Sequence, residues 1–266
     1  QQLKTLLVGE SNLRTISVRY PEALKKLYLI YNHYLCRIQN LDRFAQLTEL
    51  EILGSPFLSE LAGVESLTKL KHLYIFRCHR LKTLPGLGKL TGLTRLWLKE
   101  CTNLLALPGL ENLLGLTFLS CELCKCLSSL PGLDKLTKLT DLDLYGCSSL
   151  ASLPGLENLI ALRKLDLRGL NLRELPEWLP EIAESFTMTS YGFNSGTTGA
   201  VVNLYGTTIE GVDMSIFEQP YEVVAEWFRN RSQGSTRTLN EIKVVFLGDG
   251  EAGKSHTIAR LMNDGG

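Results

Sequence analysis

Leucine recurs along most of the chain at a fixed interval of 23 residues. Each unit follows the pattern L-x-x-L-x-[LI]-x-x-[CNS]-x-x-L, and the units open at Leu24, Leu47, Leu70, Leu93, Leu116, Leu139 and Leu162. The x-L-x-L segment alternates polar and apolar residues, which is typical of a short strand with one buried face. A single unit could not bury its own leucines. Successive units are therefore expected to stack, pair their strands in parallel and share one core.

The second half of each unit carries turn-forming residues. Leu-Pro-Gly-Leu recurs at 84–87, 107–110, 130–133 and 153–156. It predicts a return turn on the convex side, followed by a short helical turn. The ninth position, where the strand leaves the sheet, is small or polar and is occupied by Asn32, Ser55, Cys78, Cys101, Cys124 and Cys147. Such side chains can bond to backbone groups of neighbouring units and form a ladder.

These units predict an α/β fold, a leucine-rich-repeat solenoid over residues 1–215. We expect a horseshoe with a parallel concave sheet of about eight to nine 23-residue repeats, regular over 24–184 and similar to the cysteine-containing leucine-rich repeats. A shorter unit at Leu3 is expected to start the stack. Towards the other end, Leu170 takes the ninth position and Leu172 the apolar place after it. An irregular Ser/Thr/Gly-rich insertion at about 185–200 then precedes a degenerate last unit at Val202.

Charge and cysteine content narrow the functional classes. The chain has 28 basic and 28 acidic residues among 266, so nothing in its net charge favours nucleic acid or an anionic membrane as the partner. No apolar run is long enough to form an integral membrane segment, and no secretion signal is present. Seven cysteines cannot all pair, so we expect reduced thiols and a cytoplasmic protein. Both ends have the character of cuts in a longer protein.

Cys121, Cys124 and Cys126 have the spacing of half a zinc site. The repeat phase favours a structural role, because Cys121 replaces a core leucine, Cys124 is the ladder residue and Cys126 falls in the turn. No second cysteine or histidine pair lies nearby in the sequence, and the histidines of the repeats fall in different phases. We therefore expect neither a metal site nor a hydrolytic Ser/His/Asp set in the solenoid.

Side chains that point away from the predicted core align as columns across neighbouring units. At the third, fifth, seventh and eighth positions, aromatic and arginine side chains fall in adjacent units and form one patch. The patch consists of Tyr74, Phe76, Arg77, Arg95, Trp97 and Phe118. These residue types dominate binding hot spots, although scattered exposed aromatics are also common on sheets. We interpret the patch as a binding site for a protein or peptide, either a separate molecule or another domain of the same protein.

An acidic sector is predicted further along the same surface. Asp141, Asp143 and Asp166 occupy its third and fifth positions. The sector either attracts a basic partner or is a solvated face, and the sequence leaves both interpretations open.

The periodicity changes after the last repeat. Residues 216–241 are expected to hold a helix at about 221–231, followed by a polar linker. The apolar face of this helix consists of Val223, Val224, Trp227 and Phe228. Such a helix would cover the open end of the repeat core, where leucines would otherwise face water.

A strand-like segment at 242–247 leads into the phosphate-binding pattern G-x-x-x-x-G-K-[ST] and the start of a helix. The loop consists of Gly248, Asp249, Gly250, Glu251, Ala252, Gly253, Lys254 and Ser255. In this strand–loop–helix context the glycines let backbone N–H groups surround phosphates at a helix N-terminus. Lys254 would contact the β- and γ-phosphates, and the Ser255 hydroxyl would bind Mg²⁺ in a complete domain.

The order of these parts resembles the Roco proteins, in which leucine-rich repeats precede a Ras-like Roc GTPase domain. The resemblance implies that residues 242–266 begin such a domain, that the complete protein binds GTP or GDP with Mg²⁺, and that it forms a homodimer. Immune-receptor ATPases place their nucleotide domain before the repeats instead. The switch and base-reading motifs of a GTPase are absent up to Gly266. The 266 residues therefore contain no catalytic set and do not distinguish guanine from adenine.

Two functions are compatible with this organisation. The first is a protein-interaction solenoid that senses or recruits a partner on its concave face and regulates an adjoining GTPase. The second is a stand-alone scaffold or adaptor with no nucleotide function.

Overall fold

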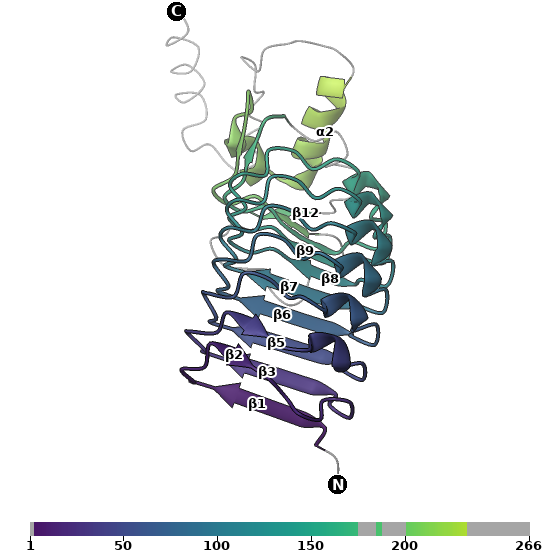
Figure 1. The fold of residues 1–266 in the computed structure, drawn as a ribbon. Coiled ribbons are helices and arrows are strands. Elements are labelled where there is room, and N and C mark those ends of the chain that lie inside the picture. The colour runs from purple at the N-terminus through teal and green to yellow at the C-terminus, as the bar shows by residue number, and fades with distance from the viewer. Residues whose placement is uncertain (1–2, 175–184, 188–200, 233–266) are drawn as a thin grey trace, which may run out of the picture. The chain divides into compact units, whose positions relative to one another are not determined.

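The computed structural model describes residues 3–174, 185–187 and 201–232. Within them, ten strands form one parallel sheet (Figure 1). In spatial order the strands are β1 (Thr5–Gly9), β3 (Lys26–Ile30), β5 (Glu49–Leu53), β6 (His72–Phe76), β7 (Arg95–Lys99), β8 (Phe118–Ser120), β9 (Asp141–Asp143), β10 (Lys164–Asp166), β13 (Val201–Asn203) and β12 (Ser185–Thr187). Nine of these strands follow chain order, which confirms the predicted stack of parallel repeat units. The unit at β1 starts it.

Shorter elements lie outside this sheet. Two small parallel sheets pair β2 (Thr15–Ile16) with β4 (Arg37–Ile38) and β11 (Asn171–Leu172) with β14 (Thr208–Ile209). The 3-10 helices are η1 (Leu41–Arg43), η2 (Val64–Ser66), η3 (Leu87–Lys89), η4 (Leu110–Asn112), η5 (Leu133–Lys135), η6 (Leu156–Asn158) and η7 (Met214–Glu218). Figure 1 shows η1 to η6 stacked along one side of the sheet, one per repeat. The helices η3 to η6 are the short helical turns that the Leu-Pro-Gly-Leu pattern predicted, and η1 and η2 form the same turn without a proline.

A left-handed residue precedes each of the helices η1 to η6. At Gly109 the φ angle is 84°, and a Cβ atom there would lie 2.7 Å from the Cα atom of Gly88. Only glycine meets both conditions without strain. In the first of these turns Asn40 takes the glycine position with a φ of 52°, in keeping with the tolerance of asparagine for this conformation.

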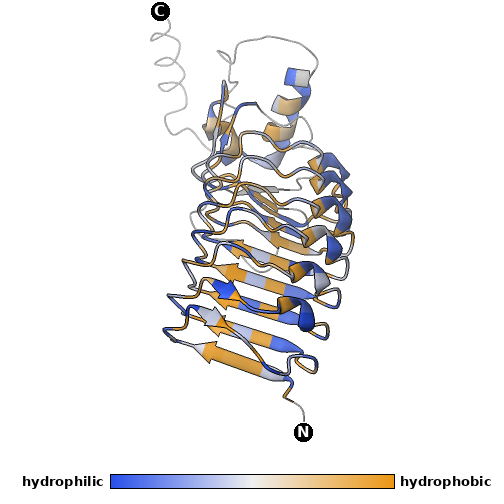
Figure 2. Cartoon of the chain, in the orientation of Figure 1, coloured by the Kyte–Doolittle hydropathy of each residue, from blue (hydrophilic) through white to orange (hydrophobic). Residues whose placement is uncertain are grey.

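The repeat leucines form one continuous core. Each strand pairs with the next in a register that places equivalent positions side by side, so that Leu50 pairs with Leu73 and Leu73 with Leu96. All three side chains are fully buried. Because side chains alternate between the two faces of a strand, a slip of one residue would turn every leucine into solvent. Figure 2 shows the resulting alternation of apolar and polar positions along the strands.

The ladder at the ninth position is a set of hydrogen bonds between units. The side chain donates to the carbonyl oxygen of the sixth residue of the preceding unit, at 2.8 Å from Asn32 Nδ2 to Val8, 2.8 Å from Cys124 Sγ to Leu98 and 3.0 Å from Cys147 Sγ to Cys121. The prediction that these residues bond to backbone groups of neighbouring units is therefore confirmed for Asn32, Cys101, Cys124 and Cys147. Burial raises the pKa of the Cys147 thiol to about 12, so the sulfur stays protonated and remains a donor.

The ladder is incomplete at three places. The Cys78 thiol donates to the Phe76 carbonyl oxygen of its own unit, at 3.8 Å, and not to the preceding unit. Ser55 is fully buried, yet its hydroxyl oxygen has no hydrogen-bond partner among the described residues. Leu170 occupies the same position with an apolar side chain and is also fully buried, as the sequence indicated. The ninth position therefore accepts a small or apolar side chain even where that side chain makes no hydrogen bond to a neighbouring unit.

The end of the core is closed by η7 and α2 (Tyr221–Ser232). Val224, Phe228 and Phe217 belong to the same buried cluster as the repeat leucines, which confirms that the helix caps the solenoid. Trp227 is half-buried against this cluster, whereas Val223 is 44% exposed, so its assignment to the buried face was wrong. The buried stripe is centred on Val224, and Val223 lies about 100° away from it around the helix.

One strand departs from the expected order. Residues Ser185–Thr187 fall in the predicted irregular insertion, but they form β12, which pairs with β13 on the side away from β10. Strand β13 therefore stacks directly on β10 although the insertion separates them in sequence.

Residues Gln1–Phe228 form one compact unit, and Arg229–Gly266 form a second, of which only the end of α2 is described. No helix in the described part of the chain is long and apolar enough to cross a bilayer.

Asn32 and Ser55 allow a direct test of the ladder. We expect Asn32→Ala to lower the free energy of unfolding by about 1–3 kcal/mol, because it leaves the Val8 carbonyl without its donor and removes the acceptor of the Ser11 hydroxyl. Ser55→Ala is expected to be neutral or stabilising, because it removes a buried hydroxyl that makes no hydrogen bond. Chemical denaturation of both variants measures the difference. Equal destabilisation by the two substitutions would show that the ladder bonds contribute nothing.

Candidate binding surface on the sheet

The side chains at the third, fifth and seventh positions of each repeat unit project from the sheet on the side opposite the leucine core. We call this side the sheet surface. The parallel register sets like positions side by side, so that Tyr74 pairs with Trp97 and Arg95 with Phe118. Residues that lie 23 apart in the sequence therefore become neighbours, as the column argument predicted.

Three aromatic rings on this surface form a continuous stack, which we call the aromatic row. The ring centroids of Tyr74 and Trp97 lie 4.1 Å apart at 15°, and those of Trp97 and Phe118 lie 4.4 Å apart at 31°. The Arg95 guanidinium carbon lies 5.6 Å from the Trp97 ring centre. The rings are half-buried because they cover one another. Such contacts hold the rings in place before any partner arrives.

The other two residues of the predicted patch lie apart from this row. Phe76 is two positions further along β6, and the Arg77 guanidinium carbon lies 4.7 Å from its ring centre. Arg77 also forms an ion pair with Glu100 at 2.7 Å. Its charge is therefore already paired within the chain. The structure thus brings Tyr74, Arg95, Trp97 and Phe118 together and places Phe76 and Arg77 in a second contact beside them.

Ion pairs surround the aromatic row. On one side, the Glu49 carboxylate pairs with Lys26 at 2.8 Å and accepts a hydrogen bond of 3.0 Å from the Tyr28 hydroxyl. Burial opposes ionisation of Glu49, but the hydrogen bonds from Lys26 and Tyr28 outweigh it and lower its pKa. On the other side, Lys99 pairs with Glu122 at 2.8 Å.

Glu51 is the exception on this surface. It sits in the fifth-position column between Tyr28 and Tyr74 and is half-buried. No side chain of the described residues forms an ion pair with it or donates a hydrogen bond to it. Burial and the nearby Glu49 carboxylate raise its pKa. The 23-residue period places Glu51 in the same column as Tyr74 and Trp97. Glu51 is nevertheless missing from the predicted binding patch, because the sequence does not show which carboxylates are paired.

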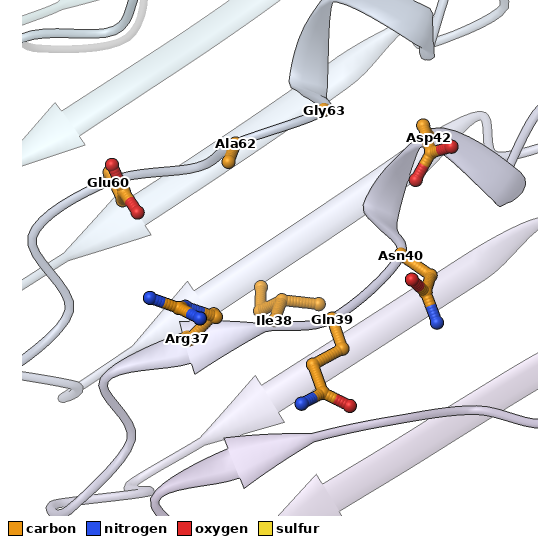
Figure 3. A pocket seen from close by; sticks show the side chains of 8 residues that line it. All are labelled: Arg37, Ile38, Gln39, Asn40, Asp42, Glu60, Ala62 and Gly63. Carbon is orange, nitrogen blue, oxygen red and sulfur yellow. The ribbon is translucent and has the colours of Figure 1, made fainter.

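A polar hollow of about 530 Å³ lies away from the sheet surface. It is lined by Arg37, Ile38, Gln39, Asn40, Asp42, Glu60, Ala62 and Gly63 (Figure 3). The side chains in Figure 3 spread apart rather than converge on one point, and most of them are exposed. The hollow therefore lacks the convergent polar groups of a ligand site. The phosphate-binding loop from Gly248 to Ser255 lies outside the described residues.

The fold can now be compared with known proteins. No family model matches the chain, and no curated protein matches it. A leucine-rich-repeat protein of Leptospira interrogans is similar in structure, with a TM-score of 0.58 and 22% identity over 77% of this chain and 49% of that protein. The fold is that of the leucine-rich-repeat proteins. The chain spans about half the length of the Leptospira protein, 49%.

Two further leucine-rich-repeat structures are similar at lower scores. Internalin C2 of Listeria monocytogenes gives a TM-score of 0.43 and 22% identity over 62% of this chain and 71% of internalin C2. The ectodomain of a plant membrane receptor kinase from Arabidopsis thaliana gives 0.48 and 17% over 77% of this chain and 33% of its own.

The carboxylates of the predicted acidic sector form ion pairs or hydrogen bonds within the chain. The Asp166 side chain is buried in an ion pair with Arg168 at 2.7 Å, so it is not a solvated charge. Asp143 accepts hydrogen bonds from the Tyr145 backbone N–H at 3.0 Å and from the Ser120 hydroxyl at 3.1 Å. Both interpretations of the sector are therefore wrong for Asp166, whereas Asp143 is half-buried and still reaches solvent.

These aspartates end their strands instead. Where the fifth position is Ser, Asp or Asn, its side chain accepts from the backbone N–H two residues further on, and the strand stops there. This explains why β8, β9, β10 and β13 have three residues, whereas β3, β5, β6 and β7 have five. The aromatic row therefore spans the last two long strands, β6 and β7, and the first short one, β8.

Ionisation of Asp143 lowers the free energy of unfolding in a pH-dependent way. Burial, followed by the nearby Asp166 and Glu122 carboxylates, raises its pKa from 3.8 to about 6. The folded state therefore disfavours the ionised form. The cost is absent below the unfolded pKa of 3.8, grows as the pH rises from there to about 6, and stays constant at higher pH. We expect Asp143→Asn to raise the free energy of unfolding above neutral pH, on the order of 1 kcal/mol, with no gain at pH below the unfolded value.

Asparagine keeps the acceptor oxygen for the Tyr145 N–H, as Asn203 already does for Tyr205 on β13. Urea denaturation of both proteins across this pH range measures the difference. A variant less stable than the parent above neutral pH would show that the ionised carboxylate is stabilising.

Proposed function

We propose that the solenoid binds a protein or peptide on its sheet surface, with the aromatic row as anchor. The observation that carries this proposal is the continuous stack of Tyr74, Trp97 and Phe118 on the face opposite the core. Contiguous exposed apolar surface on a folded domain commonly marks an interaction site. Tryptophan, tyrosine and arginine are the residues most enriched at binding hot spots.

The rigidity of the sheet supports the same proposal. The flanking residues Leu96 and Leu98 are fully buried, so the backbone that carries Trp97 is fixed by the core. The row is also held by its own ring contacts and by Arg95. A surface that is ordered before binding loses little conformational entropy when the partner docks.

We expect Trp97→Ala to weaken partner binding about 30-fold, equivalent to about 2 kcal/mol. The fold should remain, because Trp97 projects away from the leucine core. The probe is a peptide selected on the wild-type chain from a random library displayed on phage, and its affinity is measured by isothermal titration calorimetry. Circular dichroism checks that the variant is folded.

Tyr34→Ala is the matched control, because Tyr34 is 52% exposed and lies outside the sheet. Its effect on affinity should stay within about twofold, as expected for a side chain outside the interface. Equal affinities of the wild type and Trp97→Ala for every selected peptide would place the binding site elsewhere.

We also propose that residues 242–266 begin a GTPase domain in the longer protein, and that partner binding regulates this domain. The proposal rests on the complete loop pattern from Gly248 to Ser255 and on the order of repeats, helix and loop. In that domain Lys254 would hold the β- and γ-phosphates of GTP, and Ser255 would bind Mg²⁺. A scaffold or adaptor without nucleotide binding is the second candidate.

The chain up to Gly266 should bind GTP with Mg²⁺ only weakly and should not hydrolyse it. It lacks the base-reading and switch motifs, and a short strand and helix without the rest of their sheet would not fix the loop. A longer chain that continues through the domain should bind GTP, and Lys254→Ala should abolish this binding. Calorimetry compares the three proteins. Failure of the longer chain to bind any nucleotide would favour the adaptor, and micromolar binding by the 266 residues would contradict the expectation.

A further inference from the structure

Most charged side chains on the strands of the sheet surface have partners. Lys26 pairs with Glu49, Lys99 with Glu122, Lys164 with Asp141 and Arg168 with Asp166. Among the described residues of this surface, three charged side chains form no ion pair: Glu51, Arg95 and Asp143. The Asp143 carboxylate accepts hydrogen bonds from Ser120 and the Tyr145 N–H instead. Glu51 and Arg95 flank the aromatic row, and they have opposite signs.

The Glu51 carboxylate lies at the Tyr74 end of the row. The neighbouring tyrosine on the other side, Tyr28, directs its hydroxyl to Glu49 and leaves Glu51 without a donor. A half-buried carboxylate without a partner loses further solvation when a ligand covers it. Any segment that docks on the row must therefore bring a positive charge to Glu51. The Tyr74 ring beside it adds an attraction for the same cation.

Arg95 provides the complementary charge. Its side chain is exposed, its guanidinium lies over the Trp97 ring, and no carboxylate of the described residues pairs with it. Its strand, β7, lies two strands from the β5 strand of Glu51. Two strand spacings and a shift of two residues along the strand separate the two Cα atoms by roughly 12 Å. A guanidinium placed in this way favours a carboxylate, which it can bind through two N–H groups.

We infer that the partner is an extended peptide segment with a basic side chain at Glu51, an apolar or aromatic side chain on the row, and an acidic side chain at Arg95. The inference rests on the proposed function of the row. In an extended chain the two charged residues would be three or four positions apart, since each residue spans about 3.3 Å. A single-stranded nucleic acid could also stack on the rings. Its phosphates would be repelled by Glu51, whereas Glu49 is already neutralised by Lys26, and this repulsion favours the peptide.

Selection from a random peptide library displayed on phage tests the inference, using the wild type, Glu51→Gln, Arg95→Gln and Glu122→Gln. Peptides selected on the wild type should be enriched in basic and acidic residues three or four positions apart around an apolar residue. Selection on Glu51→Gln should lose the basic enrichment alone, and selection on Arg95→Gln the acidic enrichment alone. The affinity of a wild-type peptide should fall about tenfold for Glu51→Gln.

Glu122→Gln is the control, because Glu122 is a carboxylate of the same surface that already pairs with Lys99. It should keep both enrichments, and thermal unfolding checks that each variant is folded. Selection of no peptide by the wild type would contradict the proposed function. Peptides that bind in a Trp97-dependent manner without basic enrichment, or with the same enrichment on Glu51→Gln, would overturn the inference alone. Trp97-dependent binding of a thymidine oligonucleotide in preference to every peptide would also overturn it.

Discussion

The burial of leucine between neighbouring repeats is the interaction on which the rest of this structure depends. Fully burying one leucine side chain stabilises a protein by about 1.5–3 kcal/mol, whereas a ladder hydrogen bond contributes about 1 kcal/mol. The units contribute many such leucines, and nearly all of those in the repeats are fully buried. The leucines therefore fix the register, and the polar ladder follows it. Leu170 illustrates this order, because a unit without a ladder donor still stacks.

The same register creates the candidate binding surface. Once Leu73 and Leu96 are paired, Tyr74 and Trp97 must lie side by side on the opposite face. The stacked rings take up no space in the leucine core, so they do not disturb its packing. The surface can therefore vary in composition from unit to unit while the leucines remain constant. This separation lets one architecture carry aromatic, ion-paired and strand-ending residues at the same position of successive repeats.

The fifth position shows how much one residue type changes. In β6 and β7 it is aromatic, the strand continues for two more residues and the side chain faces outward. In β9 and β10 it is aspartate, which bonds to the backbone ahead of it and ends the strand. The aspartates thus bond to the backbone, and the aromatic row lies on β6, β7 and the first residue of β8. Glu51 lies on a long strand without a partner, so its charge remains available for a ligand.

The sequence alone determined the fold, the strand positions, the ladder and the neighbours in each column. All of these follow from a fixed period, because the backbone repeats whenever the leucines do. It could not decide which charges were neutralised. Glu49 and Glu51 are alike in sequence, but only Glu49 meets Lys26 and Tyr28. It also missed the strand at Ser185–Thr187, which lies outside the period, and misjudged Asp166 as a surface charge. Pairing and burial depend on the rotamers and neighbours of each side chain, which only the tertiary structure fixes.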